Sequence, residues 1–224
     1  MLTPLRDPPA RLPADPPTRT WSAALPMVRV YHEHPHRDAM VPRTFGPLNR
    51  FDPHVRDRLR QPRQDPQGRG VLYLARDLAT ALAEAYPDQW PEVSICPHSR
   101  AGWARPADRP FRLLDLTGNG AMAIGAVGTV AWGDEPRRRT QRWGRRIYEQ
   151  YAELDGIVYH AAHQGGESVA LWERARGLQP VPGGDRKLWA VWRYVVDALA
   201  AQRRYPRRVA AAGCQGCRGA GFTT

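Results

Sequence analysis

The 224-residue chain has few cysteines, the residues whose disulfides stabilise many secreted proteins, and no apolar stretch long enough to cross a membrane. It has 3 cysteines, one alone and two close together near the C-terminus, and these do not make a disulfide framework. No apolar run approaches the roughly 20 residues that span a bilayer. The N-terminal sequence MLTPLRDPPARLPADPPTRT has no apolar core of the kind found in secretory signals. We therefore expect a cytoplasmic protein that does not enter a membrane.

Lysine is almost absent as well, since Lys187 is the only lysine among 33 basic residues. A GC-rich coding bias explains this excess of arginine without any function. The net charge of +11 still attracts polyanions, and guanidinium groups suit bidentate contacts with phosphate. The candidate partners are nucleic acid, an acidic protein and a phosphate-bearing small molecule, and composition does not choose among them.

The distribution of proline, glycine and apolar residues divides the chain into three parts. Residues 1–26 form a proline-rich irregular lead, residues 27–204 a single domain, and residues 205–224 a basic, glycine-rich tail that we expect to be mobile. We predict strands over 28–32, 71–75, 92–96, 111–116, 156–160 and 169–172, and helices after 77 and over 137–154 and 186–204. The segments 33–70 and 97–110 are predicted to be loops. Strands and helices do not alternate strictly, which favours an α+β fold over a doubly wound sheet.

The central stretch of the domain runs from residue 70 to residue 85, GVLYLARDLATALAEA. Its apolar run of strand length carries Tyr73, and Asp77 is a good N-cap for the helix that follows. Leu78, Leu82 and Ala85 form the core-facing stripe of that helix. Glu84 lies roughly 120° away from the stripe, at about 100° per residue, so it can face a cleft.

Six short motifs occur in an order that resembles a RES domain over roughly residues 28–175. They are Arg29; Arg50-Phe51; Leu72-Tyr73-Leu74-Ala75; Ala81-Leu82-Ala83-Glu84; Leu114-Asp115-Leu116-Thr117; and Asp155-Gly156-Ile157-Val158-Tyr159. Each motif is short and unspecific, but the six in order are considerably more specific.

The resemblance implies an α+β fold related to that of ADP-ribosyltransferases. It also implies an enzyme that breaks the nicotinamide–ribose bond of NAD+, with water or phosphate as the acceptor. Many members of this family are bacterial toxins paired with a helix-turn-helix antitoxin. NAD+ would then be the substrate and no cofactor would be needed, while nucleic acid would be contacted only through the partner. Whether the chain forms a homo-oligomer stays open.

The resemblance also assigns roles to individual residues. Arg29 and Arg50 would clamp the pyrophosphate of NAD+, because guanidinium groups bind phosphate bidentately. Tyr73 would offer a ring for stacking on a nucleotide ring. Glu84 would stabilise the oxocarbenium character that develops at the ribose carbon. We therefore expect Glu84, Tyr73 and Arg29 to be catalytic, and we expect Arg29, Arg50 and Tyr73, together with Tyr159, Ala161 and His163, to bind the substrate.

Ala161 departs from the family pattern, in which a serine follows the tyrosine of the later strand by two residues. Losing that hydroxyl costs on the order of 1 kcal/mol for one hydrogen bond, and more in a buried site. His160 or His163 are the candidates to replace it. Because Arg29, Arg50, Tyr73 and Glu84 are all present, we favour an active enzyme over a silent module that binds NAD+ or a protein partner.

Two further patterns have simpler explanations. Cys214-Gln215-Gly216-Cys217 is half of a zinc site with no other ligand at suitable spacing, although Cys96 or His163 could approach it in space. We interpret it, and the alternating histidines at 32, 34 and 36, as incidental, and we predict no metal. A nucleic-acid-binding protein would interleave arginines with exposed aromatics, but the aromatics of the 137–154 helix lie on its predicted buried stripe.

Overall fold

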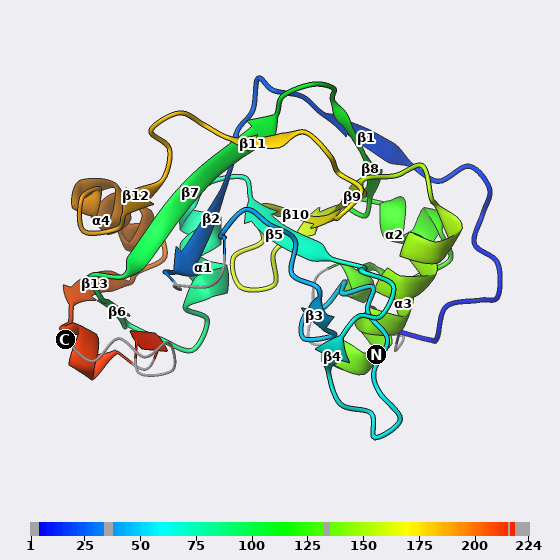
Figure 1. Ribbon diagram of the computed structural model, residues 1–224, viewed down its shortest axis with the longest axis horizontal. Coiled ribbons are helices and arrows are strands. Elements are labelled where there is room, and N and C mark those ends of the chain that lie inside the picture. Colours follow the sequence, from blue (N-terminus) through cyan, green and yellow to red (C-terminus); the bar gives the residue numbers. More distant parts are fainter. Residues whose placement is uncertain (1–4, 34–37, 132–134, 215, 218–224) are drawn as a thin grey trace.

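A curled mixed sheet organises the chain, as the computed structural model shows for residues 5–33, 38–131, 135–214 and 216–217 (Figure 1). The strand order is β1-β8-β9-β10-β5-β2-β7-β11, and β12 also pairs with β7. Neighbouring strands of this sheet are antiparallel except for the parallel pair β8–β9. Its strands are β1 (Thr18–Trp21), β2 (Met27–His32), β5 (Val71–Ala75), β7 (Ser99–Pro106), β8 (Phe111–Asp115), β9 (Gly156–His160), β10 (Glu167–Trp172), β11 (Leu178–Pro180) and β12 (Arg186–Lys187).

Two small ribbons and a few helices complete the described structure. One ribbon pairs β3 (Phe45–Gly46) with β4 (Arg63–Gln64), and the other pairs β6 (Glu92–Ile95) with β13 (Tyr205–Arg208). The helices are α1 (Leu78–Ala85), α2 (Gly120–Ala123), α3 (Arg137–Gln150) and α4 (Trp192–Ala200), with 3-10 turns at Gly128–Val130 and Ala211–Gly213. No helix in the described ranges is long and apolar enough to cross a membrane.

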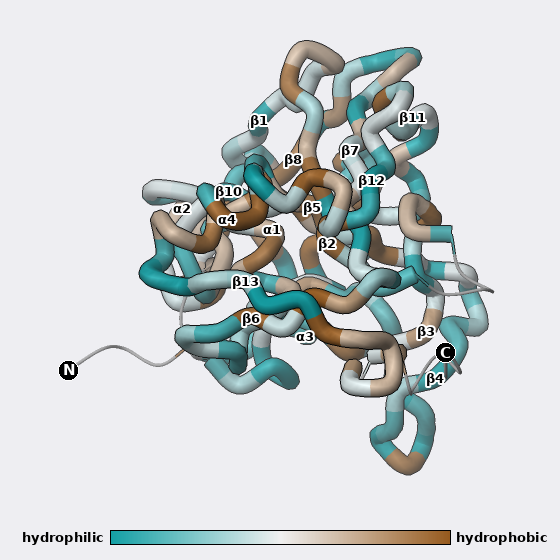
Figure 2. The backbone as a smooth tube through the Cα atoms, turned by 90° about the vertical axis from the view of Figure 1, so that its left-hand side faces the viewer, coloured by the Kyte–Doolittle hydropathy of each residue, from teal (hydrophilic) through white to brown (hydrophobic). Residues whose placement is uncertain are grey.

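Strand β5 lies in the middle of the sheet and is covered on both faces, which explains its uninterrupted apolar sequence. Val71 and Tyr73 belong to the core beneath α3, whereas Leu72 and Leu74 belong to a second core that forms where the sheet curls. The residues of β5, β10 and α1 are mostly hydrophobic, and these elements lie in the middle of the molecule (Figure 2).

The predicted cap of α1 and the predicted inner stripe of α3 are confirmed, whereas the stripe predicted for α1 is only partly right, because Leu82 is buried but Ala85 is exposed. The side chain of Asp77 accepts a hydrogen bond from the backbone N–H of Thr80 at 2.8 Å and so caps α1. The inner stripe of the 137–154 segment is buried as predicted, at Trp143, Ile147, Tyr151 and Leu154. Figure 1 shows α3 on one side of the molecule and α1 and α4 on the other.

Two predictions within the domain were wrong. The expected loop over 97–110 contains β7, which is held by pairing with β2, β11 and β12. The long helix predicted over 186–204 is limited to α4, because the backbone at Arg186 and Lys187 pairs with β7 instead. The buried positions of α4 are Val195 and Leu199.

Both chain ends are more structured than the sequence suggested. The lead contains β1, which pairs with β8, and it buries Leu5, Leu12 and Trp21. The tail begins with β13, which pairs with β6, and Cys217 is also buried. Residues 1–4 and 218–224 lie outside the described residues. The α+β class is confirmed.

Candidate functional site

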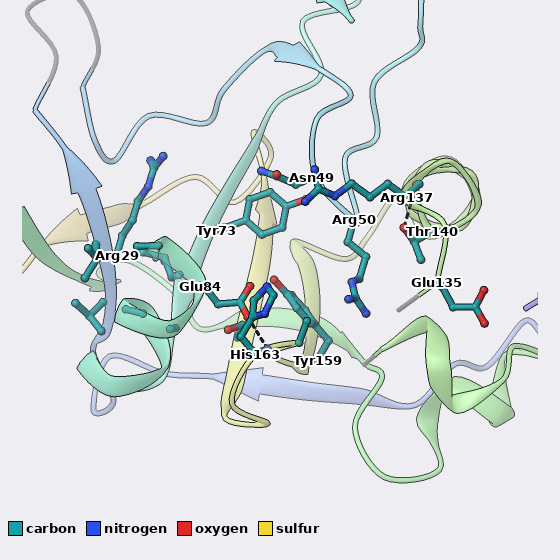
Figure 3. A pocket seen from close by; sticks show the side chains of 18 residues that line it. Arg29, Asn49, Arg50, Tyr73, Glu84, Glu135, Arg137, Thr140, Tyr159 and His163 are labelled. Atoms are coloured by element: carbon teal, nitrogen blue, oxygen red, sulfur yellow. Dashed lines mark hydrogen bonds between the residues drawn. The ribbon is translucent and has the colours of Figure 1, made fainter. Parts of the chain in front are cut away.

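A cleft of about 580 Å³ lies over the middle of the sheet, between α1 and the amino end of α3 (Figure 3). Antiparallel pairing explains how its floor is built. Val28 of β2 pairs with Ala75 of β5, Ala75 pairs with Ser168 of β10, and Ser168 pairs with Tyr159 of β9. Paired residues of antiparallel strands point to the same face, so these four side chains form one row across four strands. All four line the cleft.

Glu84 stands at the wall of the cleft that α1 provides. Its Oε1 accepts a hydrogen bond from the backbone N–H of His163 at 3.2 Å, which ties α1 to the loop between β9 and β10. That loop approaches α1 closely, because a Cβ added to Gly166 would lie 2.1 Å from Thr80 Oγ1. The close approach places the Glu84 carboxylate beside Tyr159 at the edge of the floor (Figure 3).

Tyr159 is buried, and its pKa is raised above its ordinary value. Burial is the main cause, and the negative charge of Glu84 adds to it. A hydrogen bond with the Ser168 side chain acts in the opposite direction. The phenol is therefore neutral at physiological pH and presents a hydroxyl beside the carboxylate of Glu84.

A second wall is formed by the loop that carries Asn49 and Arg50. Its geometry is set by Asp52, whose side chain is fully buried and accepts hydrogen bonds from the Asn49 N–H at 3.1 Å and the Tyr73 hydroxyl at 2.7 Å. The Tyr73 hydroxyl in turn accepts one from the N–H of Phe51 at 3.1 Å. Tyr73 and Arg50 are thus fixed relative to each other through one carboxylate.

Arg29 lies at the margin of the same cleft, and its guanidinium points away from Glu84, Arg50 and Tyr159 (Figure 3). Its Nη1 donates to the carbonyl oxygen of Ala39. Burial lowers the pKa of Arg29, and the neighbouring Arg43 lowers it further. Both effects disfavour the positive charge of Arg29. A bound anion would offset them, because its negative charge would interact favourably with both guanidinium groups.

The structure thus brings six of the seven expected site residues to one cleft, namely Arg29, Arg50, Tyr73, Glu84, Tyr159 and His163. Ala161 is only 1% exposed and does not line it. Ser168 supplies a hydroxyl there instead. Ser168 pairs with Tyr159, and Ala161 follows Tyr159 by two residues, with its N–H bonded to the carbonyl oxygen of Gly166. Ala161 and Ser168 therefore lie on the same face of the β9–β10 hairpin.

Sequence reasoning missed the site roles of Asp52, Ser168 and Arg137. Arg137 starts α3 and enters the cleft from the same side as Arg50. The sequence of the α3 helix showed its arginine-rich face but not which arginine meets the cleft. Asp52, three residues after Asn49 in a turn, could have been read as a turn carboxylate. No local signal pairs Ser168 with Tyr159.

Comparison with known proteins identifies the family of this chain. The RES domain family model matches residues 26–197. A chain of the M. tuberculosis MbcT–MbcA toxin–antitoxin complex is similar in fold, with a TM-score of 0.51 and 19% sequence identity over 79% of this chain and 91% of that chain. No curated protein matches the sequence. Since the family model covers most of the chain, the protein belongs to the RES domain family.

Proposed function

We propose that the protein cleaves the bond between nicotinamide and ribose in NAD+. The observation that carries this proposal is a carboxylate, Glu84, held at the edge of a polar floor in a cleft with arginines at its margins. The dinucleotide has the matching pattern of charge, with a pyrophosphate at its centre and a cationic nicotinamide ring at one end.

The reaction requires little more than positioning and electrostatics. The bond between the ribose anomeric carbon and the nicotinamide nitrogen breaks, and nicotinamide leaves with the electron pair as a neutral molecule. Positive charge develops on the ribose, where the negative charge of Glu84 stabilises it. The oxygen of water or phosphate then bonds to the anomeric carbon, and the acceptor loses a proton.

The remaining groups fit substrate binding. Arg50 and Arg137 reach the cleft from the wall opposite α1, and Arg29 occupies the other margin. A pyrophosphate that binds any of these guanidinium groups would be held bidentately. The ring of Tyr73 has its hydroxyl tied to Asp52, so it can offer an ordered face for stacking.

Nicotinamide release from NAD+, measured with and without inorganic phosphate, tests the proposal. We expect release by the wild-type protein and a loss of about 100- to 1000-fold for Glu84→Gln, which keeps the shape and removes the charge. Glu153→Gln is the matched control, because Glu153 is an exposed carboxylate outside the cleft. Dependence on phosphate would identify phosphate as the acceptor. Intact NAD+ in every sample would refute the proposal.

We further propose that the protein is the toxin of a toxin–antitoxin pair. Support comes from its membership of the RES family and from the fold it shares with a chain of a toxin–antitoxin complex. Depletion of NAD+ would arrest growth, and a helix-turn-helix antitoxin would inhibit the toxin. Induced expression in bacteria should stop growth and lower cellular NAD+, whereas Glu84→Gln should do neither. Normal growth on induction would contradict the toxin role, whereas growth arrest with unchanged NAD+ would contradict NAD+ cleavage as its cause.

One observation favours a second candidate, a module that binds NAD+ or a protein partner without turnover. The family serine is replaced by Ala161. NAD+ binding by calorimetry in the absence of nicotinamide release would support the silent module, and Ala161→Ser would then test whether a single hydroxyl restores turnover.

A further inference from the structure

All three cysteines of the chain, the CxxC pair and the distant Cys96, meet at one point together with one of its 7 histidines. The ligand atoms of His32, Cys96, Cys214 and Cys217 all lie within 4.8 Å of one another. His32 ends β2, Cys96 follows β6, and the two others come from the segment after β13. Figure 1 shows this end of the chain beside β6 and β13.

The distances fit one tetrahedral ion. The Nε2 atom of His32 is 3.1 Å from the sulfur of Cys217, 3.3 Å from that of Cys96 and 3.9 Å from that of Cys214. The sulfurs of Cys96 and Cys217 are 3.4 Å apart. A zinc ion with Zn–S bonds of about 2.3 Å and a Zn–N bond of about 2.0 Å separates its ligand atoms by about 3.5 to 3.8 Å. Small adjustments of the side chains would therefore complete the tetrahedron.

The surroundings prepare these groups for a metal. The Nδ1 atom of His32 lies 2.9 Å from the carbonyl oxygen of Glu33, to which it can donate, and in that tautomer Nε2 carries the lone pair that binds a metal. The hydroxyl of Ser99 is 3.3 Å from the Cys96 sulfur and can donate to a thiolate. The backbone N–H groups of Gly216 and Cys217 hydrogen-bond to the sulfur of Cys214. Such hydrogen bonds stabilise thiolates that bind a metal.

Gly216 lies against the His32 ring. A Cβ at this position would be 3.0 Å from Cδ2 of His32, which is tighter than most real contacts. Cys96 and Cys217 are fully buried, and Cys214 is half-buried. Four protein ligands, two of them fully buried, would fill the coordination sphere of a tetrahedral ion, as in structural rather than catalytic zinc sites.

We propose that His32, Cys96, Cys214 and Cys217 bind one structural Zn²⁺, which fastens the C-terminal segment to β2 and β6. The donor set, one imidazole and three thiolates, is typical of structural zinc and unsuited to magnesium or calcium. The prediction of no metal from sequence failed to see this set because two of the ligands lie more than a hundred residues before the CxxC. His34 and His36 lie outside the described residues.

The metal content of the full-length protein, purified in reducing buffer without chelators, tests the site. We expect about one zinc per chain by elemental analysis, and a large loss of bound zinc in Cys214→Ser and Cys217→Ser. His98→Gln is the matched control, because the His98 ring lies 6.1 Å from that of His32 but is not one of the four ligands. It should keep its zinc.

A second measurement does not depend on the variants folding. Wild-type protein stripped of metal and loaded with Co²⁺ should show the intense thiolate-to-cobalt charge-transfer absorption and the visible bands of a tetrahedral site. Cys214→His, which replaces one ligand by another, should retain binding and shift these bands. The proposal fails if the reduced wild-type protein binds neither zinc nor cobalt, or if thiol titration and mass spectrometry find a disulfide among the three cysteines.

Discussion

Asp52 shows how much of this site depends on single buried groups. Four donors reach its carboxylate, namely the Arg43 guanidinium, the backbone N–H groups of Leu48 and Asn49, and the Tyr73 hydroxyl. A buried carboxylate with this many donors is well satisfied, and each donor it loses leaves charge uncompensated. Asp52 therefore couples the wall that carries Arg50 to the strand that carries Tyr73.

Tyr73→Phe tests this coupling. The substitution removes a donor to buried Asp52 and the acceptor of the Phe51 N–H, so we expect the free energy of unfolding to fall by about 1–3 kcal/mol. Urea denaturation measures the change. Tyr194→Phe provides the control, since Tyr194 is 68% exposed and its loss of a hydroxyl should alter stability by less than about 0.5 kcal/mol. Equal effects of the two substitutions would show that Asp52 does not depend on Tyr73.

A pH dependence follows from His54, which is buried next to Asp52. Burial lowers its pKa below the ordinary value of 6.5, although the Asp52 carboxylate opposes the shift. The unfolded chain therefore takes up this proton at higher pH than the folded protein. The stabilising contribution is complete above about pH 6.5 and is lost as the pH falls from there towards the lower folded pKa.

His54→Gln should remove this part of the pH dependence while retaining a donor for the Arg43 carbonyl, which lies 3.1 Å from Nε2. Denaturant unfolding between about pH 5 and pH 8 should show a steeper loss of stability with acid in the wild type than in the variant. Parallel curves would mean that His54 does not titrate differently in the two states.

At the scale of elements, close backbone contact positions the cleft walls. Helix α3 crosses the chain at Phe51, where a Cβ on Gly144 would lie 2.8 Å from the backbone atoms of that residue. Alanine in a helix is ordinarily more stable than glycine by about 0.5–1 kcal/mol. The clash with backbone reverses this sign, because neither element can yield without moving the loop that carries Arg50.

We therefore expect Gly144→Ala to destabilise the fold by about 1–3 kcal/mol and, given the proposed function, to weaken NAD+ binding. Thermal unfolding and the Michaelis constant for NAD+ are the measurements. A Cβ at Gly213 would meet no atom within 4 Å, so Gly213→Ala is the control and should change neither. A stabilised Gly144→Ala would show that α3 and the Phe51 backbone can move apart.

The elements that sequence predicted correctly are those specified by their own residues. Strand β5 has an apolar run with both faces covered, and α1 has the cap at Asp77. Strand β7, with the sequence SRAGWARP, contains arginine, glycine and proline, and its extended form depends on neighbours that are distant in sequence. The same dependence removed residues 186–187 from the predicted helix, since they pair with β7.

At the scale of the molecule, the lead belongs to the domain. Leu5 and Leu12 pack into the same core as Trp143 of α3, and the backbone N–H of Leu12 donates to Gln150 Oε1 at 2.7 Å. Proline content suggested an irregular segment, and most of it lacks regular structure. Its two leucines are nevertheless core residues, which composition alone does not reveal.

Leu5→Ala and Leu12→Ala should each lower the free energy of unfolding by about 2–5 kcal/mol, the usual cost of a large-to-small change in a core. Leu59→Ala is the control, because Leu59 is 79% exposed and should contribute almost nothing. Chemical denaturation of the three variants distinguishes a lead that belongs to the core from one that only lies on it. Equal stabilities of all three would place the lead outside the cooperative unit.

The candidate site was predictable in its residues but not in its geometry. Motif order identified Arg29, Arg50, Tyr73, Glu84 and Tyr159, all of which line the cleft, as does His163, whereas the expected Ala161 does not. It could not show that Arg29 points away from Arg50, nor that Asp52 organises one wall. Those relations depend on strand register and loop packing over long sequence separations, as does the meeting of the three cysteines.

The hairpin of β9 and β10 has a consequence for how such proteins are compared. Ala161 and Ser168 occupy the same face, one diagonal step apart, with Tyr159 opposite the serine. A serine at either position would therefore present its hydroxyl to the same face of the hairpin. Comparison of sequences position by position shows only that the family serine is missing at 161. Comparison in three dimensions also shows the hydroxyl that Ser168 brings to the cleft from the neighbouring strand.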